Sequence, residues 1–251
     1  MKKLLTVAAA VLAFGTGSAQ AAEGTALPEY HWSFNGIFGT FERPELQRGF
    51  QVYREVCSAC HGLRLVAFRD LAALGYSADA IKALAADYTF KDGPNDQGEM
   101  YEREGRPSDH FPSPFPNEKA AAFANGGSAP PDLSLMAKAR KGGPDYVRAL
   151  LMGFEEAPAE SHIPEGLHYN IYFPGHQIAM PPPLSADAVE YSDGTPATVE
   201  QMATDVAAFL MWAAEPTLEQ RKEMGIKVLI FLLVFTGVLY AAKRKIWSDL
   251  H

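Results

Sequence analysis

The chain contains only two cysteines among its 251 residues, and they stand in the sequence Cys57-Ser58-Ala59-Cys60-His61. Residues at positions i and i+3 share one face of a helix, so the two thiols of this C-x-x-C-H pattern can each form a thioether with one vinyl group of a haem. The histidine that follows is then held beneath the iron as its proximal ligand. The motif therefore predicts one covalent haem c, bound through Cys57 and Cys60 and ligated by His61.

Other interpretations of the cysteine pair explain less of the pattern. A structural zinc site needs further Cys or His ligands at close spacing, and none stands nearby. A thioredoxin-like redox pair has no need of the following histidine and normally lies near a βαβ pattern, which this sequence lacks. A chance occurrence is the remaining alternative.

The first 21 residues have the features of a secretory signal peptide. Two lysines precede an apolar run over residues 4–14, and the small residues AQA at 19–21 fit a cleavage site. A short buried helix would not show this order of charge, apolar run and small residues. We therefore expect the mature chain to begin at residue 22, with its body in an oxidising compartment.

A second apolar run lies near the C-terminus, where residues 228–242 carry no charge. Residues 225–242 would form roughly 27 Å of helix, near the thickness of a bilayer core. A buried globular helix would show a polar face, and this run shows none. Lys243, Arg244 and Lys245 follow at once, which predicts a cytoplasmic C-terminus, and Trp247 suits the membrane interface.

These two ends predict the organisation of the whole chain. We expect a signal peptide at 1–21, a periplasmic domain at 22–216, a membrane-anchor helix at 217–246 and a cytoplasmic tail at 247–251. The protein would cross a bacterial inner membrane once.

The charge of the predicted periplasmic domain is strongly one-sided. Residues 22–216 carry 14 Lys/Arg and 27 Asp/Glu, a balance of 14 − 27 = −13. No base lies between Arg148 and Arg221, and ten acids occur from Glu155 to Glu215. Such a surface attracts basic partners and repels nucleic acid, so docking of a basic protein is expected and DNA or RNA binding is not. A merely solvated acidic face is the alternative.

The regular elements of the domain are predicted to be short helices separated by Pro- and Gly-rich segments. Residues 91–125 and 155–196 are expected to be irregular, and no strong strand alternation is present. The fold class is therefore mainly α, with long loops around a haem and one C-terminal transmembrane helix. We expect helices to begin at Pro44, at 78 after a Ser77 cap, at 133 (ending at 141), at an Asp145 cap, and at the capping boxes Thr198/Gln201 and Thr217/Gln220.

A second axial ligand is expected opposite His61, and the sequence leaves two candidates. Met180 precedes three prolines, which fix φ and hold the residue in a stiff, extended segment. His176, four residues earlier, would instead give a bis-histidine site. Methionine ligation raises the reduction potential and fills the sixth position, which favours electron transfer over oxygen chemistry.

Taken together, these segments resemble the cytochrome c1 family, the haem-bearing subunits of cytochrome bc1 complexes. The resemblance runs from about residue 27 to 247. It rests on the haem motif and on further segments in the same order: RGFQVY at 48–53, DGPN at 92–95, PPDLS at 130–134, GGPDY at 142–146, DGTPAT at 193–198 and WAAEP at 212–216.

The resemblance implies site residues that the spacing alone does not give. The family's ligand pair falls on His61 and Met180, and Arg140 matches a residue that approaches a haem propionate. Asn125, Pro130, Pro131 and Tyr146 match pocket-lining positions. The chain departs from some bacterial members, which have an extra cysteine pair near the ligand loop, and Lys141 replaces the histidine of mitochondrial members. What stiffens the Met180 loop is therefore an open question.

The resemblance also implies a function in electron transfer rather than bond chemistry. The expected donor is the Rieske iron–sulfur protein, the acceptor a cytochrome c, and the stable membrane partner cytochrome b. Three alternatives remain: a membrane cytochrome of another electron route, a haem sensor or peroxidase with an open iron position, and a haem-free thiol oxidoreductase.

Overall fold

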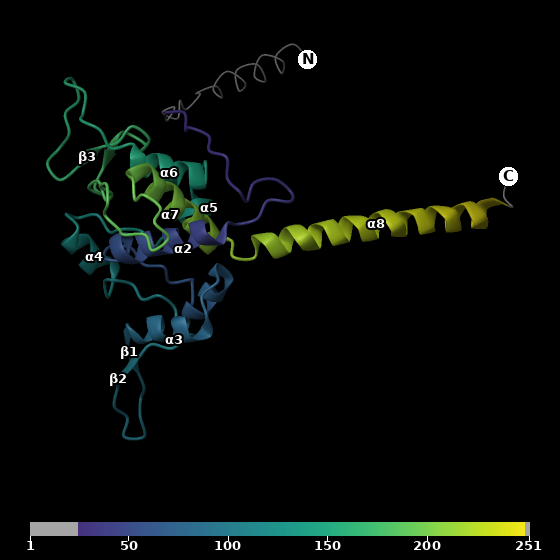
Figure 1. The fold of residues 1–251 in the computed structure, drawn as a ribbon, viewed down its shortest axis with the longest axis horizontal. Helices are drawn as coiled ribbons and strands as arrows, with labels where there is room; N and C mark the ends of the chain where they lie inside the picture. The colour runs from purple at the N-terminus through teal and green to yellow at the C-terminus, as the bar shows by residue number, and fades with distance from the viewer. Residues whose placement is uncertain (1–24, 249–251) are drawn as a thin grey trace, which may run out of the picture.

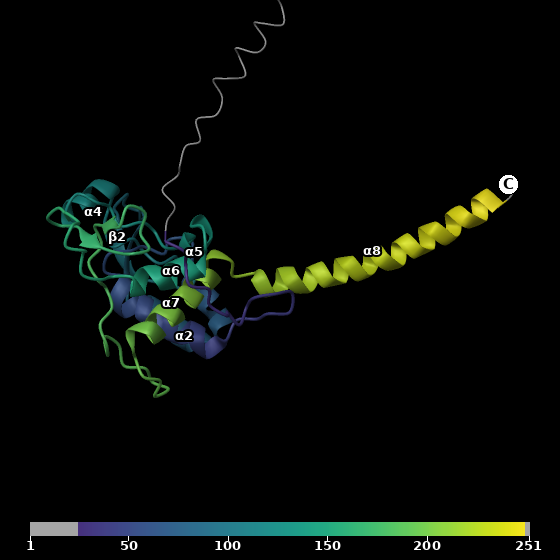
Figure 2. The same ribbon diagram turned by 90° about the horizontal axis from the view of Figure 1, so that it is seen from above.

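The computed structural model describes residues 25–248, so the predicted signal peptide lies outside the described residues (Figure 1). A mainly helical body carries one long helix that projects away from it (Figures 1 and 2). The α-helices are α2 (Arg43–Val52), α3 (Ala78–Ala86), α4 (Glu118–Ala124), α5 (Met136–Ala139), α6 (Pro144–Met152), α7 (Val199–Ala214) and α8 (Leu218–Trp247), with a π-helical turn at Tyr53–Cys57 and a 3₁₀ helix at Phe68–Leu74.

Helix α7 is the centre of the body. Eleven of its 16 residues are buried, and α2 and α6 pack against it. A helix that is apolar on nearly all sides is expected to be enclosed by other elements, as α7 is. Phe209 of α7 contacts Phe50 of α2 and Tyr53 of the π-helical turn, with ring centroids 5.6 and 5.8 Å apart. The central helix therefore supports the segment that leads into the C-x-x-C-H motif.

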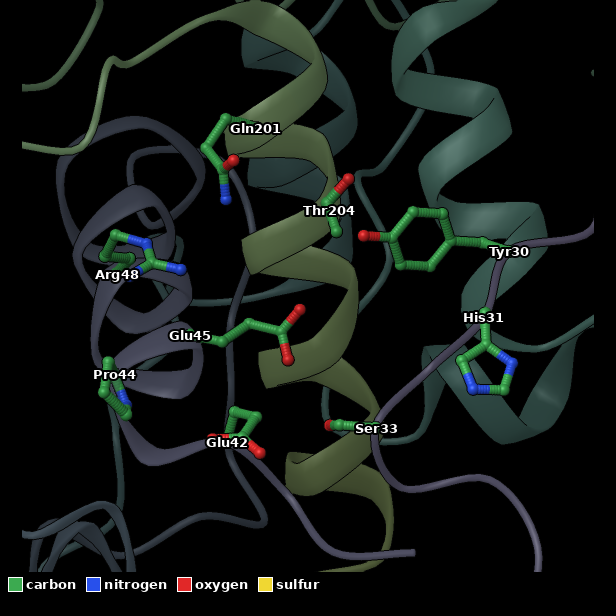
Figure 3. A pocket seen from close by; sticks show the side chains of 9 residues that line it. All are labelled: Tyr30, His31, Ser33, Glu42, Pro44, Glu45, Arg48, Gln201 and Thr204. Carbon is green, nitrogen blue, oxygen red and sulfur yellow. The ribbon is translucent and has the colours of Figure 1, made fainter.

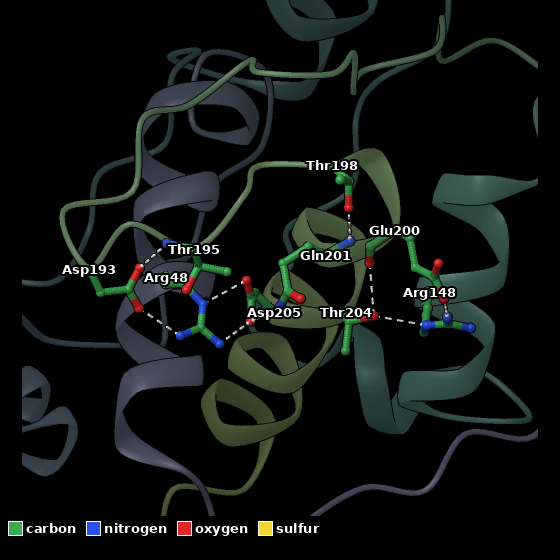
Figure 4. Close-up of polar contacts among 9 residues, drawn as sticks. All are labelled: Arg48, Arg148, Asp193, Thr195, Thr198, Glu200, Gln201, Thr204 and Asp205. Carbon is green, nitrogen blue, oxygen red and sulfur yellow. Dashed lines mark hydrogen bonds and ion pairs between the residues drawn. The ribbon is translucent and has the colours of Figure 1, made fainter.

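Helices α2 and α7 approach each other closely at Gly49. A Cβ atom at this position would lie 2.0 Å from the carbonyl oxygen of Asp205, so only glycine allows the two backbones to meet here. The residue directly before Gly49, Arg48, lies against Asp205, whose side chain is fully buried. The Arg48 guanidinium donates two hydrogen bonds of 3.0 Å to the Asp205 carboxylate and one of 2.9 Å to Asp193 (Figure 4).

A second polar group joins α6 to α7 (Figure 4). Arg148 is buried on α6 and donates to the Thr204 hydroxyl at 2.9 Å and to Glu200 at 2.6 Å. Its guanidinium also lies 4.6 Å from the centre of the Tyr30 ring. The N-terminal segment is thereby held on the helices, and its Trp32 donates a 2.6 Å hydrogen bond to Asp145.

A cavity of about 400 Å³ lies between α2, α7 and this N-terminal segment. Glu45 reaches from α2 toward its middle, with Tyr30 and Ser33 on the far side (Figure 3). Burial and the nearby Asp205 carboxylate raise the pKa of Glu45 to about 7, although Arg48 acts in the opposite direction. Protonation of Glu45 below that pH removes one negative charge beside the buried Asp205.

The C-terminal helix α8 covers almost all of the predicted membrane anchor. It is long and apolar enough to cross a membrane, and none of its 18-residue apolar window is buried against the body. Within the described residues it is the one helix with these properties. Its first turn is held to the body by Glu219, which accepts hydrogen bonds from the Phe41 amide and from Arg43.

Several predicted helix starts are confirmed, and others are wrong. Ser77 and Thr198 cap α3 and α7 through their hydroxyls, although Gln201 donates to Asp205 instead of completing the box. Asp145 does not cap α6, which begins after Gly143, because its carboxylate is bound by Trp32. Thr217 makes no side-chain cap hydrogen bond.

The long segments expected to be irregular contain regular elements. The segment 91–125 contains most of an antiparallel hairpin, formed by β1 (Thr89–Asp92) and β2 (Tyr101–Glu104), and the helix α4. Strand β1 begins two residues before this segment. The second segment holds the short antiparallel pair β3 (His168–Tyr169) and β4 (Gln177–Ile178). The predicted helix at 133–141 is reduced to α5, four residues long.

Candidate haem site

The C-x-x-C-H motif forms one closed turn at the end of the π-helical turn. The carbonyl oxygen of Cys57 accepts hydrogen bonds from the Cys60 amide at 3.1 Å and from the His61 amide at 2.9 Å. Cys57 is half-buried and Cys60 is exposed. Burial raises the pKa of the Cys57 thiol to about 12. The two sulfur atoms therefore belong to one turn, as attachment to a single haem requires.

His61 is oriented by a segment 70 residues further along the chain. Its ring Nδ1 lies 2.7 Å from the Pro131 carbonyl oxygen, to which it can donate a hydrogen bond. Burial lowers the pKa of His61, while the contact with Pro131 and the Asp132 carboxylate act against this shift. A neutral ring that donates through Nδ1 leaves Nε2 as the lone-pair nitrogen, which is the arrangement of a metal-ligating histidine.

The Pro131 segment is tied to the haem motif at several further points. The Leu133 amide donates to the Gly62 carbonyl at 2.9 Å, and Asp132 accepts from the Arg64 amide at 3.0 Å. The buried Ser134 hydroxyl accepts from the Leu65 amide at 3.1 Å. These contacts fix the position of the Pro131 carbonyl and therefore the orientation of the His61 ring.

Arg140 and Tyr146 line a cavity of about 590 Å³ together with Leu27, Tyr172 and Phe173. This volume is in the usual range for small-molecule and cofactor sites. Burial raises the pKa of the Tyr146 phenol, and the nearby Arg140 guanidinium opposes that shift. The cavity thus combines aromatic walls with two cations, Arg140 and Lys141, which suits a largely apolar ligand with an acidic edge.

The segment that carries Met180 is held by a residue that the sequence did not single out. Asn170 is fully buried, and its side-chain amide donates to the Leu150 carbonyl of α6 at 2.8 Å. Its side-chain oxygen accepts from the amides of Tyr172 and Phe173 at 3.0 and 3.2 Å. The pairing of β3 with β4 closes the same loop, and Met180 follows two residues after β4, half-buried.

His176, the alternative ligand, takes part in closing this loop. Its Nδ1 lies 3.2 Å from the Asn170 carbonyl, and its ring packs on Tyr169 with centroids 5.7 Å apart. Asn170 and the β3–β4 pair thus hold the loop that carries Met180, and three prolines follow Met180 directly. No pattern in the sequence distinguishes Asn170 from an ordinary loop asparagine.

The other residues predicted to line the pocket do not form one group in the structure. Pro131 touches His61, whereas Pro130 is half-buried and Asn125 ends α4, donating to the Ala121 carbonyl at 2.8 Å. Arg140 is exposed at the end of α5. The structure therefore brings Pro131 to His61 and Tyr146 to Arg140, and it shows no contact that joins Asn125 or Pro130 to either pair among the described residues.

We expect Asn170→Ala to loosen the Met180 loop, because it leaves the Leu150 carbonyl and the half-buried amides of Tyr172 and Phe173 without this partner. Each such group costs about 1–3 kcal/mol. Denaturant unfolding should show lower stability, and the methionine–iron absorption band should weaken at unchanged haem content. Gln177→Ala is the matched control, since its exposed side chain makes one 3.3 Å hydrogen bond in the same loop. Equal effects of the two variants would contradict this role.

The fold and the site define a class of protein. The C-x-x-C-H turn and the oriented His61 fit a covalent haem, the Arg140/Tyr146 cavity suits an apolar ligand, and α8 fits a membrane anchor. This is the class of membrane-anchored c-type cytochromes.

Within this class, the chain belongs to the cytochrome c1 family, whose model matches residues 32–250. The cytochrome c1 of Rhodospirillum rubrum is 53% identical, over 99% of this chain and 97% of the relative. A mitochondrial cytochrome c1 heme protein of Arabidopsis thaliana is 51% identical, over 96% of this chain and 79% of the relative. The cytochrome b/c1 of Bradyrhizobium diazoefficiens is 52% identical over all of this chain, which spans 41% of that relative.

Proposed function

We propose that this chain is the electron-transfer subunit of a cytochrome bc1 complex, accepting electrons from the Rieske iron–sulfur protein and passing them to a cytochrome c. The observation that carries the proposal is the His61 ring, fixed by the Pro131 carbonyl at the end of a C-x-x-C-H turn in a chain of this family. When bound, the haem c supplies a one-electron couple, and the chain itself makes and breaks no bond.

The residues of the chain have distinct roles in this proposal. Cys57 and Cys60 would attach the haem, and His61 and Met180 would ligate its iron. Arg140 compensates an acidic edge of the group, Tyr146 provides an aromatic wall of the cavity, and Asn125, Pro130 and Pro131 complete the lining. The loop that Asn170 holds would keep Met180 in place as a ligand, and an iron held by two side chains argues against a sensor or peroxidase.

The membrane arrangement belongs to the same proposal. Helix α8 would cross the inner membrane, with Lys243, Arg244 and Lys245 on the cytoplasmic side and the body in the periplasm. Cytochrome b would be the stable partner, which the name of the Bradyrhizobium relative supports.

Attachment through both cysteines is tested by mass spectrometry of the full chain. We expect one covalent haem and no free thiol, whereas Cys57→Ser and Cys60→Ser should each lose one thioether. Ser58→Ala is the control within the motif, because its hydroxyl only donates to the Arg54 carbonyl at 2.7 Å. A wild-type chain with both thiols titratable would refute covalent attachment.

Fewer acidic residues are available for docking a basic partner than the charge count indicates. Four of the ten acids form ion pairs within the chain: Asp193, Glu200, Asp205 and Glu215. The other six are exposed and form no ion pair in the described part of the chain: Glu155, Glu156, Glu160, Glu165, Asp187 and Glu190. They flank the Met180 segment. The loop before β3 lies on the side of the body away from α8 (Figure 1).

We therefore expect the rate of electron transfer to a basic cytochrome c to fall steeply with ionic strength where association is limiting. The Debye length falls from about 10 Å at 0.1 M to about 3 Å at 1 M, so steering is screened. Charge reversal at Glu155 and Glu156 should flatten this dependence in stopped-flow measurements and leave the haem spectrum unchanged. Reversal of Asp79, an exposed acid on α3, is the control. A wild-type rate that is independent of salt would exclude steering.

A further inference from the structure

A short uncharged loop near the N-terminus exposes two large apolar side chains. Residues 33–41 contain no charged residue. Phe34 and Phe41 are 4% and 5% exposed, and their rings lie 4.9 Å apart, so they anchor the loop in the core. Between them Ile37 and Phe38 are 68% and 83% exposed. The loop therefore has an apolar tip on a buried base, and nothing in the described body covers that tip.

This loop is fastened directly to the start of α8. The Lys222 ammonium donates to the Phe34 carbonyl at 2.6 Å and to the Gly39 carbonyl at 3.0 Å, which closes the loop on both sides of the tip. Glu219, one turn earlier on α8, accepts a 2.8 Å hydrogen bond from the Phe41 amide. Both views show the loop projecting on the side from which α8 leaves the body (Figures 1 and 2).

The distance that the loop tip reaches along the axis of α8 can be compared with the point at which the apolar part of α8 begins. From Lys222 to Val228, where the uncharged run begins, the helix rises about 9 Å. Two extended residues reach up to roughly 7 Å, and the Phe38 side chain adds to this. Since Lys222 holds the base of the loop, its tip can reach the level at which α8 enters the hydrocarbon region.

We propose that Ile37 and Phe38 insert into the lipid interface beside α8, giving the body a second membrane contact that limits its rotation about the anchor. The proposal rests on the membrane anchoring proposed above. A convex tip of two side chains is far smaller than the roughly 800 Å² per partner of a stable protein interface. It suffices for an interfacial contact that an adjacent spanning helix already holds at the membrane.

The proposal is tested with nitroxide spin labels on the full-length, haem-loaded chain in lipid nanodiscs. Labels are placed at Phe38→Cys and at two references: Leu233→Cys on the exposed apolar surface of α8, and Phe123→Cys on α4, which is 92% exposed and far from α8. Collisional relaxation is measured with oxygen, which concentrates in the bilayer, and with a nickel chelate, which stays in water.

We expect the label at 38 to resemble the one at 233, with a high oxygen effect and a low nickel effect, and the label at 123 to show the reverse. A label at 38 that resembles 123 would overturn the proposal. Low accessibility to both reagents in the assembled complex would also overturn it, because a protein would then cover the tip. If the label at 233 itself shows no lipid contact, the membrane anchoring fails; if only the label at 38 fails, the anchoring stands without this loop.

Discussion

Replacing Met180 with leucine is expected to lower the reduction potential by an amount on the order of 0.1 V, within the roughly 0.8 V range that axial ligands span. A thioether stabilises the reduced iron, and leucine of similar volume keeps the packing but supplies no sulfur. The sixth position should open to carbon monoxide, and the methionine–iron absorption band should disappear. Potentiometry and carbon monoxide difference spectra measure these changes.

Two further variants make the Met180 result specific. Met136→Leu, at a half-buried methionine packed against the core, should leave the potential and the absorption band unchanged. His176→Gln should leave the sulfur band in place, since we expect that ring to serve the loop through Asn170 and Tyr169. A Met180→Leu chain that keeps both its potential and its band would assign the sixth position to another residue.

The sequence predicted correctly those helix starts that depend on residues close together in the chain. Ser77 and Thr198 cap their helices because the hydroxyl and the amide that it binds are three residues apart. The predictions failed where a distant segment competes for the same group. Asp145 has the right position for a cap, but Trp32, 113 residues away, donates to its carboxylate.

The shortened helix α5 has a similar explanation. The residues before it, Leu133 and Ser134, are bound to Gly62 and Leu65 beside the haem motif. Residues whose amide and hydroxyl groups bind the haem motif in this way do not form a helical turn, so the helix begins only at Met136. Helical periodicity records which face a residue would present, and it contains no information on such long-range pairing.

In the candidate site, too, the features formed by neighbouring residues were predicted from the sequence, and those formed by distant residues were not. The C-x-x-C-H turn is local and was readable from five consecutive residues, whereas the Pro131 carbonyl that orients His61 is 70 residues away. Asn170 acts through three side-chain hydrogen bonds to backbone groups, and a buried asparagine in a loop leaves no pattern in the sequence. The family resemblance supplied Arg140 and Tyr146, which line one cavity.

The charge count was also only partly informative, because ion pairs depend on the tertiary structure. The run of ten acids contains Asp205, which the sequence alone would place on the acidic surface but which is fully buried against Arg48. An acid with such a partner contributes to stability rather than to docking. This difference leads to the largest effect on stability that we expect in the chain.

Arg48→Met is expected to destabilise the chain by about 3–5 kcal/mol, because it leaves the Asp205 carboxylate buried without its cation. The Asp205 side chain has no solvent exposure, and after the change the neutral Gln201 amide, at 3.0 Å, would still donate to it. Unfolding of the haem-loaded chain in detergent, followed by circular dichroism against denaturant, measures the loss. Arg69→Met is the matched control, since that arginine is 65% exposed and lies 4.0 Å from Asp70, and its loss should cost less than about 1 kcal/mol.

The double variant Arg48→Met/Asp205→Leu separates the cost of an unpaired charge from the value of the pair itself. Replacing both partners of a buried ion pair with apolar groups is often nearly neutral, so the double variant should recover much of the stability lost in Arg48→Met. Recovery would mean that the ion pair, which lies next to the Gly49 contact between α2 and α7, contributes little net stability. If Arg48→Met costs no more than Arg69→Met, the carboxylate has found water or another partner, and the two helices are less tightly closed around Asp205 than the structure shows.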